Sequence, residues 1–157
     1  MKIGFGFDTH RLEKGHDLWL AGIHIPHTKG AVGHSDADVL IHAVCDALLG
    51  AAGLRDIGFH FPDTDPEFKG IDSKILLHRT NQLVRGKSFI VGNIDCTIVL
   101  QQPKITNYIP EMIKSLATVL EVDESLISIK AKTSENLGFI GREEGVSAYA
   151  IVLLNSL

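Results

Sequence analysis

The sequence has only two cysteines in 157 residues, and Cys45 and Cys96 form no C-x-x-C pair. This excludes a disulfide framework and a zinc site built from thiolates. No apolar run approaches the length of about 18 residues that a membrane-spanning helix needs. The first residues also lack a basic segment leading into an apolar stretch. We therefore expect an untargeted, cytoplasmic protein with no membrane partner.

Clustered positive charge is also missing, because the 15 Lys and Arg residues are scattered among 19 Asp and Glu residues and the net charge is −4. Nucleic-acid binding needs gathered cations, so we expect no nucleic-acid partner. A chain of this length and 45% hydrophobic content is typical of one domain, over residues 1–157, that is stable without a structural metal. Any metal ion is therefore expected to serve function.

The hydrophobic spacing predicts alternating strands and helices, with no internal repeat. Strands are predicted at residues 2–7 and 18–20, paired as a hairpin, and a helix follows from Ser35 until Gly50 and Gly53 end it. Residues 55–72 are rich in turn formers and are interpreted as a long functional loop. Beyond the loop we predict a helix from Asp72 or Ser73 to about residue 84, a strand at 88–100, a helix opened by Pro110, and strands at 126–131 and 146–154.

A candidate metal site combines Asp8 and His10, predicted where the first strand ends, with His42 on the first helix. Strand alternation places Asp8 and His10 on one face. Two imidazoles and a carboxylate form a ligand set that leaves a fourth position on zinc open, as catalytic sites require. The alternative is that D-x-H is a common pair and His42 an ordinary, partly buried helix residue.

A candidate anion site lies in the segment Gly33-His34-Ser35-Asp36-Ala37-Asp38. His34 and Ser35 are predicted at the very start of the first helix, where free backbone N–H groups attract anions. The alternative for Ser35 is simple helix capping, with Asp36 and Asp38 favoured by the helix dipole. Capping does not require the neighbouring histidine, which adds a proton donor.

Four further motifs accompany these residues: D-I-G, F-P-D-T-D, a P-K pair and T-S-E-N-L-G-F-x-G-R-x-E-G. In the order and spacing of these motifs, residues 5–145 resemble the 2-C-methyl-D-erythritol 2,4-cyclodiphosphate synthase family. The resemblance implies zinc bound by Asp8, His10 and His42. It also implies a second divalent cation, Mg²⁺ or Mn²⁺, on Glu135, which by itself is an unremarkable loop acid. His34 and Thr133 would steady the transition state from opposite sides.

In the family reaction one phosphate of the substrate attacks another phosphorus of the same molecule and CMP is released. No protein nucleophile is needed, and the sequence indeed has no G-x-S-x-G motif. The resemblance implies that Asp56 and Gly58 bind the ribose and that Asp63 binds the methylerythritol, although Asp63 also suits a simple turn. Lys132 and Gln102 depart from the family pattern. The substrate-binding set implied for the cytidine diphosphate substrate is Asp8, His10, His34, Ser35, Asp56, Ile57, Gly58, Phe61, Asp63, Leu100, Pro103, Lys104, Ile105, Thr106, Ala131, Lys132, Thr133, Ser134, Glu135, Phe139 and Arg142.

The resemblance further implies an α/β (α+β) fold, with helices on one side of a mixed sheet, assembled as a homotrimer whose sheets face the threefold axis. Each active site would be shared between neighbouring chains. Apolar residues at 94, 96, 98 and at 146–152 suit either an intersubunit core or an ordinary one. An axial cavity for an isoprenoid diphosphate would involve Phe7, Phe139, Arg142 and Glu144.

Two other functions compete with this interpretation: a zinc phosphohydrolase that attacks an external ester with water, and a non-catalytic carrier of isoprenoid diphosphates. Asp46, one turn after His42, is either an orienting partner of that imidazole or a surface acid. No role is assigned to the remaining histidines, which are expected at the surface: His16, His24, His27, His60 and His78.

Overall fold

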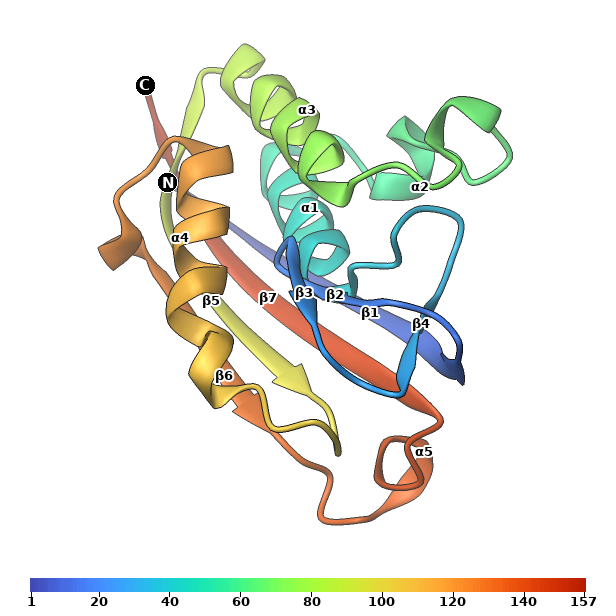
Figure 1. The fold of residues 1–157 in the computed structure, drawn as a ribbon. Coiled ribbons are helices and arrows are strands. Elements are labelled where there is room, and N and C mark those ends of the chain that lie inside the picture. The colour runs from blue at the N-terminus through green and yellow to red at the C-terminus, as the bar shows by residue number, and fades with distance from the viewer.

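Five strands form one mixed sheet in the computed structural model, which describes residues 1–157 (Figure 1). The strands lie in the order β4-β1-β7-β5-β6, and only the β5–β6 pair is parallel. A separate two-stranded hairpin joins β2 and β3. The bounds are β1 (Lys2–Lys14), β2 (Leu18–Leu20), β3 (Ile23–Ile25), β4 (Lys29–Val32), β5 (Phe89–Val99), β6 (Ile127–Lys132) and β7 (Gly145–Ser156).

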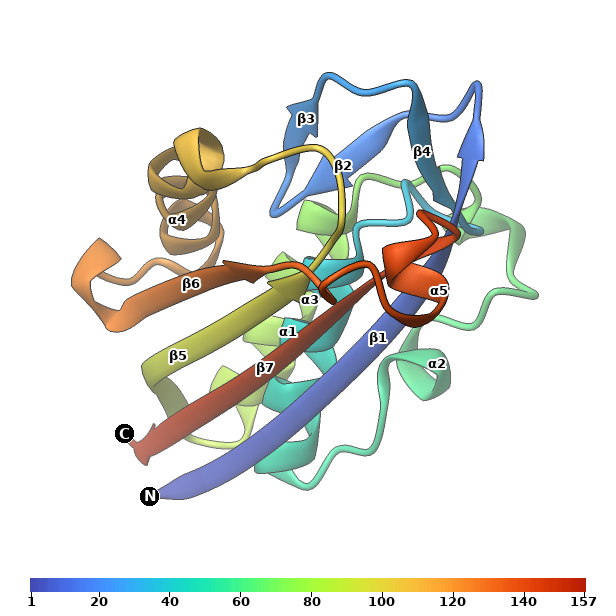
Figure 2. The ribbon, with the colours of Figure 1, turned by 90° about the horizontal axis from the view of Figure 1, so that it is seen from below.

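Three long helices cover one side of this sheet, whereas no helix lies over most of the opposite face (Figures 1 and 2). They are α1 (Val39–Ala52), α3 (Ser73–Gly86) and α4 (Ile109–Leu120). The predicted mixed α/β architecture with helices on one side is thus confirmed. No helix is both long and apolar enough to cross a membrane. The shorter elements are α2 (Ile57–His60), α5 (Gly138–Gly141) and 3-10 turns at Pro66–Phe68, Thr106–Tyr108 and Glu124–Leu126.

The first helix is the centre of the core, and eleven of its 14 residues are buried. It packs against β1 and β7 on one side and α3 on the other. Asp38 caps its N-terminus by accepting from the backbone N–H of Ile41, and Gly53 ends it in the left-handed conformation. A helix that is apolar on all sides is expected for such a central position.

Two glycines let α1 lie directly on β1. A Cβ atom at Gly4 would stand 1.9 Å from the carbonyl oxygen of Ala47, and one at Gly6 would stand 1.9 Å from that of Ala43. Only residues without a side chain allow this approach of backbone to backbone. Because strand side chains alternate, Asp8 continues the face of Gly4 and Gly6 toward the helix.

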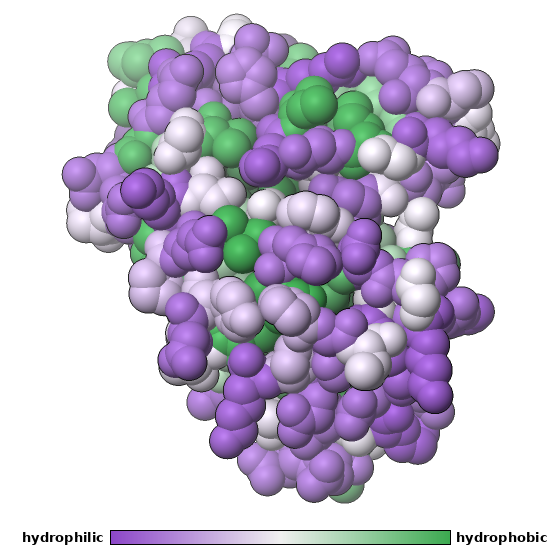
Figure 3. All heavy atoms as spheres, in the orientation of Figure 1, coloured by the Kyte–Doolittle hydropathy of each residue, from purple (hydrophilic) through white to green (hydrophobic).

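The opposite face of β1 and β7 is apolar and exposed. Phe5 is 63% exposed, Ile3 72% and Ile151 51%, and the rings of Phe5 and Phe7 both lie near Tyr149. By contrast, the surface in the view of Figure 1 is largely hydrophilic (Figure 3). The apolar strand residues that suit a core between subunits or within one chain are already buried in the single chain. They are Ile94, Cys96, Ile98, Val146, Ala148, Ala150 and Val152.

Several predicted boundaries are wrong. β1 does not end near Phe7 but continues to Lys14, because β7 pairs with it from Lys2 to Arg11 and β4 pairs with it from Arg11 to Lys14. Residues 18–20 pair with β3 rather than with β1. The loop at 55–72 contains α2 and a 3-10 turn. The predictions for α3, β5, α4, β6 and β7 are confirmed within a few residues, and Pro110 does lie in the first turn of α4.

Candidate functional site

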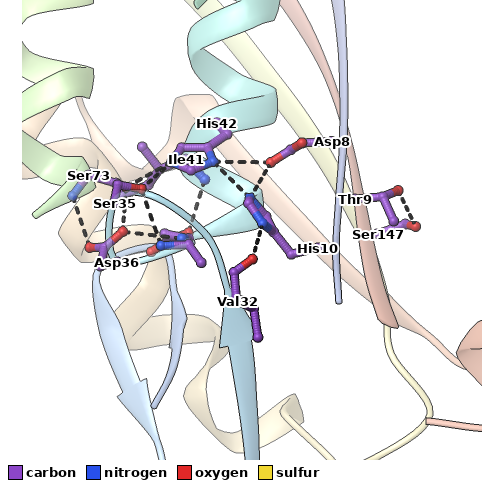
Figure 4. A network of polar contacts seen from close by, with 12 residues as sticks. Asp8, Thr9, His10, Val32, Ser35, Asp36, Ile41, His42, Ser73 and Ser147 are labelled. Carbon is purple, nitrogen blue, oxygen red and sulfur yellow. Dashed lines mark hydrogen bonds and ion pairs between the residues drawn. The ribbon is translucent and has the colours of Figure 1, made fainter. Parts of the chain in front are cut away.

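Asp8, His10 and His42 converge on one point between β1 and α1 (Figure 4). Asp8 Oδ2 lies 2.9 Å from His10 Nε2 and 3.1 Å from His42 Nδ1, and those two nitrogens are 3.1 Å apart. A tetrahedral ion bound at about 2.0–2.2 Å keeps its ligand atoms a little over 3 Å apart, so the cluster suits such an ion. The side chains are 13–27% exposed, which leaves a path for a ligand. The three residues can therefore bind a divalent metal.

The electrostatics of this cluster favour a cation at its centre. Burial opposes the charge of Asp8, but hydrogen bonds and attraction from both histidines outweigh it and lower its pKa to about 2. Burial likewise opposes a charge on His10, yet the bond and attraction of Asp8 prevail and raise the pKa of His10.

A backbone carbonyl fixes the ring nitrogen that His10 offers. His10 Nδ1 is 2.9 Å from the carbonyl oxygen of Val32. A carbonyl only accepts, so Nδ1 carries the hydrogen and Nε2 keeps its lone pair for the cluster. His42 uses the other nitrogen, because its Nδ1 faces Asp8 while its Nε2 faces the hydroxyls of Ser35 and Ser73.

A cavity of about 410 Å³ opens beside the cluster. His34 borders it, with Nε2 3.1 Å from the carbonyl oxygen of Asp65. The prediction that His34 and Ser35 lie at the start of α1 is wrong, since the helix begins at Val39. The Asp38 side chain accepts from the backbone N–H of Ile41 in the first turn of the helix, and the loop before it is joined to the segment at 70–73. The cavity is lined by His10, Gly33, His34, Ser35, His42, Ile57, Gly58, Phe61, Asp63, Phe68 and Leu76.

A second cavity, of about 250 Å³, lies where β5 and β6 end and shares no residue with the first. In the sheet, β7 separates the strands that carry the two cavities. Lys132, whose direction the sequence leaves open, is exposed at this second cavity. Its lining is Leu100, Gln101, Pro103, Lys104, Ile105, Thr106, Ala131, Lys132 and Thr133.

The other predicted site residues lie outside both cavities. Glu135 is exposed in the turn after β6, with a φ of 54°, and is not part of the metal cluster. Ser134 in the same turn donates to the carbonyl oxygen of Leu137. Phe139 is 42% exposed on α5, and Arg142 pairs with Glu144 at 3.0 Å. Asp56 is exposed at the N-cap of α2.

Three polar residues near the site were missed or misjudged. Asp46 does not orient His42: its Oδ1 accepts from the backbone N–H of Ile57 at 2.7 Å and so holds the segment with Asp56 and Gly58. Burial raises the pKa of Asp46. Asp36 and Ser73 are predicted only as residues of helix starts, but both lie in the network around His42. Ser73 is 31 residues from His42, so no spacing rule connects them.

Comparisons with known proteins agree over nearly the full chain. The profile of the YgbB family matches residues 1–155. The 2-C-methyl-D-erythritol 2,4-cyclodiphosphate synthase of Porphyromonas gingivalis is 62% identical over 153 residues, which are 98% of this chain and 94% of that protein. A solved structure of a synthase of that name in a CDP-bound form is 39% identical, with a TM-score of 0.91 and coverage of 98% of this chain and 100% of that one. The bifunctional IspDF of Campylobacter jejuni is 44% identical with a TM-score of 0.96, and the match covers 99% of this chain but 42% of that longer chain.

Proposed function

The chain belongs to the YgbB family, and on that premise we propose that it converts 4-diphosphocytidyl-2-C-methyl-D-erythritol 2-phosphate into 2-C-methyl-D-erythritol 2,4-cyclodiphosphate and CMP. This makes it a lyase of non-mevalonate isoprenoid biosynthesis, with residues 1–157 as one cytoplasmic synthase domain. The observation that carries the proposal is the convergence of Asp8, His10 and His42 beside a cavity, in a chain 62% identical to a named synthase.

The reaction needs positioning and charge neutralisation rather than a protein nucleophile. An oxygen of the substrate's 2-phosphate forms a bond to the β-phosphorus, and the bond from that phosphorus to the CMP oxygen breaks. Holding both groups in the attack geometry is worth up to about 7–11 kcal/mol in favourable intramolecular reactions. Both cysteines are buried, and burial raises the pKa of each to about 12, so neither supplies a thiolate.

The metal that we propose for the Asp8, His10 and His42 cluster is zinc, because two imidazoles and a carboxylate are a ligand set of catalytic zinc sites. When bound, zinc supplies Lewis-acid polarisation of a phosphate oxygen. His34, on the rim of the same cavity, gives its Nε2 hydrogen to the carbonyl oxygen of Asp65, so it would donate to a phosphate oxygen through Nδ1 of the doubly protonated ring as negative charge develops there. Asp8, His10 and His42 would hold the ion in place.

The remaining substrate contacts divide between the two cavities. Ser35, Ile57, Phe61 and Asp63 would bind the phosphate and polyol end in the first cavity, next to Asp56 and Gly58 for the ribose. Thr133 would assist the transition state from the second cavity. The cytidine and diphosphate contacts there would be Leu100, Pro103, Lys104, Ile105, Thr106, Ala131 and Lys132, with Ser134 in the adjoining turn.

Glu135 would bind a second cation, Mg²⁺ or Mn²⁺, since such ions prefer carboxylate and phosphate oxygens. Its exposed position after Thr133 is compatible with a ligand that arrives with the substrate. Glu135→Gln should leave the zinc content unchanged and raise the magnesium concentration needed for half-maximal turnover. Loss of zinc with an unchanged magnesium response would contradict this role.

A homotrimer with shared sites would bring the two cavities of different chains together. The apolar exposed face of β1 and β7, with Ile3, Phe5 and Ile151, would be covered at the threefold axis. Phe7, Phe139 and Arg142 would then line an axial cavity for an isoprenoid diphosphate. Support for this arrangement is that each chain holds the metal cluster in one cavity and the Lys104 segment in another.

The decisive test is incubation of the purified protein with the cytidine substrate while CMP and the cyclic product are measured. Equal amounts of both are expected. Release of inorganic phosphate carrying oxygen from water would instead identify a phosphohydrolase. Tight binding of isoprenoid diphosphates without any CMP would identify a carrier.

A further inference from the structure

A chain of hydrogen bonds extends from the metal cluster to a carboxylate on its far side (Figure 4). His42 Nδ1 faces Asp8, and its Nε2 lies 2.9 Å from Ser73 Oγ. Ser73 Oγ in turn makes a short hydrogen bond to one carboxylate oxygen of Asp36, and the Ser73 backbone N–H donates to the other at 2.9 Å. Asp36 therefore holds Ser73 at two points.

The chemistry of these groups determines the direction of the bonds. A carboxylate can only accept, so the hydroxyl hydrogen of Ser73 points to Asp36. The lone pairs of Ser73 Oγ are then left for His42, whose Nε2 must carry the hydrogen. A neutral imidazole has one N–H, so Nδ1 of His42 keeps its lone pair for a cation bound between it, Asp8 and His10.

We propose that Ser73, held by Asp36, is a positioning residue that accepts a hydrogen bond from Nε2 of His42 and so fixes Nδ1 as the metal-binding atom. This inference rests on the metal site of the proposed function. It gives His42 an anchor comparable to the carbonyl oxygen of Val32, which holds His10 in the opposite tautomer. Partners of this kind orient ligating histidines in many metal sites.

Ser35 also lies near Nε2 of His42, at 3.1 Å, but it is not held in the same way. Its Oγ accepts from the backbone N–H of Ala37 at 3.2 Å, and no carboxylate fixes its hydrogen. Ser35 can therefore turn its hydrogen toward a ligand in the cavity that it lines. Ser73, fully buried at the start of α3, cannot.

The tautomer can be observed directly in zinc-loaded protein. Long-range ¹H–¹⁵N spectra report which nitrogen of His42 carries the hydrogen. We expect Nε2–H in the wild-type protein, with slow hydrogen exchange because Ser73 accepts it, and faster exchange of that hydrogen in Ser73→Ala. A wild-type spectrum with the hydrogen on Nδ1 would overturn the proposal without any variant.

Zinc affinity, measured by competition with a chromophoric chelator, provides the second readout. Loss of a partner that orients a ligand typically costs about 10–100-fold in metal affinity, and this is expected for Ser73→Ala. Asp36→Asn should act similarly, because an amide can donate to Ser73 and reverse the bonds. The matched control is Thr80→Val, which removes an equally buried hydroxyl of α3 that takes no part in the network around His42.

The outcomes separate this inference from the function on which it rests. Wild-type protein that binds no zinc would refute the metal site itself. Stoichiometric zinc with equal affinity in the wild-type, Ser73→Ala and Asp36→Asn proteins would refute only the role of Ser73. Equal weakening in Thr80→Val would also refute it, by showing that any hydroxyl lost from α3 has the same effect.

Discussion

The cavity beside the metal cluster and the cavity at the ends of β5 and β6 differ in how completely they are built. The metal cavity lies on β1 and α1, whose side chains around it are mostly buried and fixed by hydrogen bonds to Val32, Asp36 and Ser73. The cavity at the ends of β5 and β6 is smaller and is bordered by exposed residues such as Lys132 and Thr133. No ion pair in the chain involves Lys104 or Lys132.

This difference reflects what the two halves of the proposed active site require: a metal half around Asp8, His10 and His42, and a nucleotide half at the ends of β5 and β6. A metal ion needs ligand atoms placed to within a fraction of an ångström, so its residues come from rigid, packed elements. A flexible nucleotide can be bound by a surface that is closed only when another surface covers it. We therefore expect substitutions that disturb the packing of α1 on β1 to affect metal binding. Substitutions that prevent chains from associating should affect metal-dependent activity and nucleotide binding together.

The largest effect is expected from Gly6→Ala. Its Cβ would stand 1.9 Å from the carbonyl oxygen of Ala43, so α1 must move away and carry His42 with it. We expect a loss of about 3 kcal/mol or more in the free energy of unfolding, together with loss of bound zinc. Urea unfolding and metal analysis measure both.

The matched control for that change is Gly50→Ala on α1, where nothing lies within 4 Å of the added Cβ. Because alanine is the better helix former, this variant should gain about 0.5–1 kcal/mol and keep its zinc. A Gly6→Ala protein as stable as the wild type would show that the close contact of α1 and β1 is not needed.

The second prediction concerns the shared site. His42→Ala damages only the metal half, and Lys104→Ala only the nucleotide half, so each protein alone should be inactive. Unfolding the two together and reassembling them should restore about one quarter of the sites, because each half is intact with probability one half in a cyclic oligomer. CMP release and sedimentation are the measurements. Mixed trimers without activity would place the whole site within one chain.

The third prediction concerns pH and the metal half alone. The lowered pKa of Asp8 gives stability that is present above about pH 4 and lost as the pH falls toward 2. The raised pKa of His10 gives stability that is present below about pH 6.5 and lost as the pH rises through its folded pKa. Zinc requires neutral His10, so stabilisation by zinc has the opposite dependence and grows with pH.

The rise in Tm caused by saturating zinc should therefore be greater at about pH 8 than at about pH 6. Below the pKa of His10, one competing proton changes the zinc affinity about tenfold per pH unit, which corresponds to about 1.4 kcal/mol and about 3–6 °C for a chain of this size, and above that pKa the dependence flattens. Differential scanning calorimetry measures the shift, with Asp8→Ala as the variant that should show almost none. A zinc-induced shift that is independent of pH would contradict the role of His10.

The smallest effect is expected from Asp46→Ala, which frees the backbone N–H of Ile57. The loss of one such hydrogen bond, about 0.5–1.5 kcal/mol, should weaken CMP binding by about 2–10-fold and leave zinc affinity unchanged. Isothermal titration with CMP measures it. Asp46→Asn, which keeps an acceptor oxygen, is the control and should bind nearly normally, whereas a change in zinc affinity would connect Asp46 to the metal half.

The sequence predicts the metal half better than its surroundings. Alternation along β1 places Asp8 and His10 on one face, and the three ligands do meet. The start of α1 could not be predicted, because Ser35, Asp36 and Asp38 are all good caps. Asp38 caps the helix in the structure while it also binds the backbone N–H groups of Ala21 and Gly22, which are distant in sequence. Burial is the main cause that raises the pKa of Asp38 to about 6.

Other errors have the same physical origin. The hairpin predicted between β1 and β2 fails because Ala21 and Gly22, both at positive φ, turn the chain directly from β2 into β3. Ser73 and Asp46 act through contacts to residues far away in the chain or on another element. Local spacing reports which side of an element a residue occupies, but not which distant partner it meets.

The pairing of β1 with β7 has a consequence for the order in which the site can form. Asp8 and His10 are synthesised before residues 145–154, yet the strand that carries them pairs with those residues. Contacts so distant in sequence form slowly. We therefore expect the cluster to bind metal only after β7 has paired with β1.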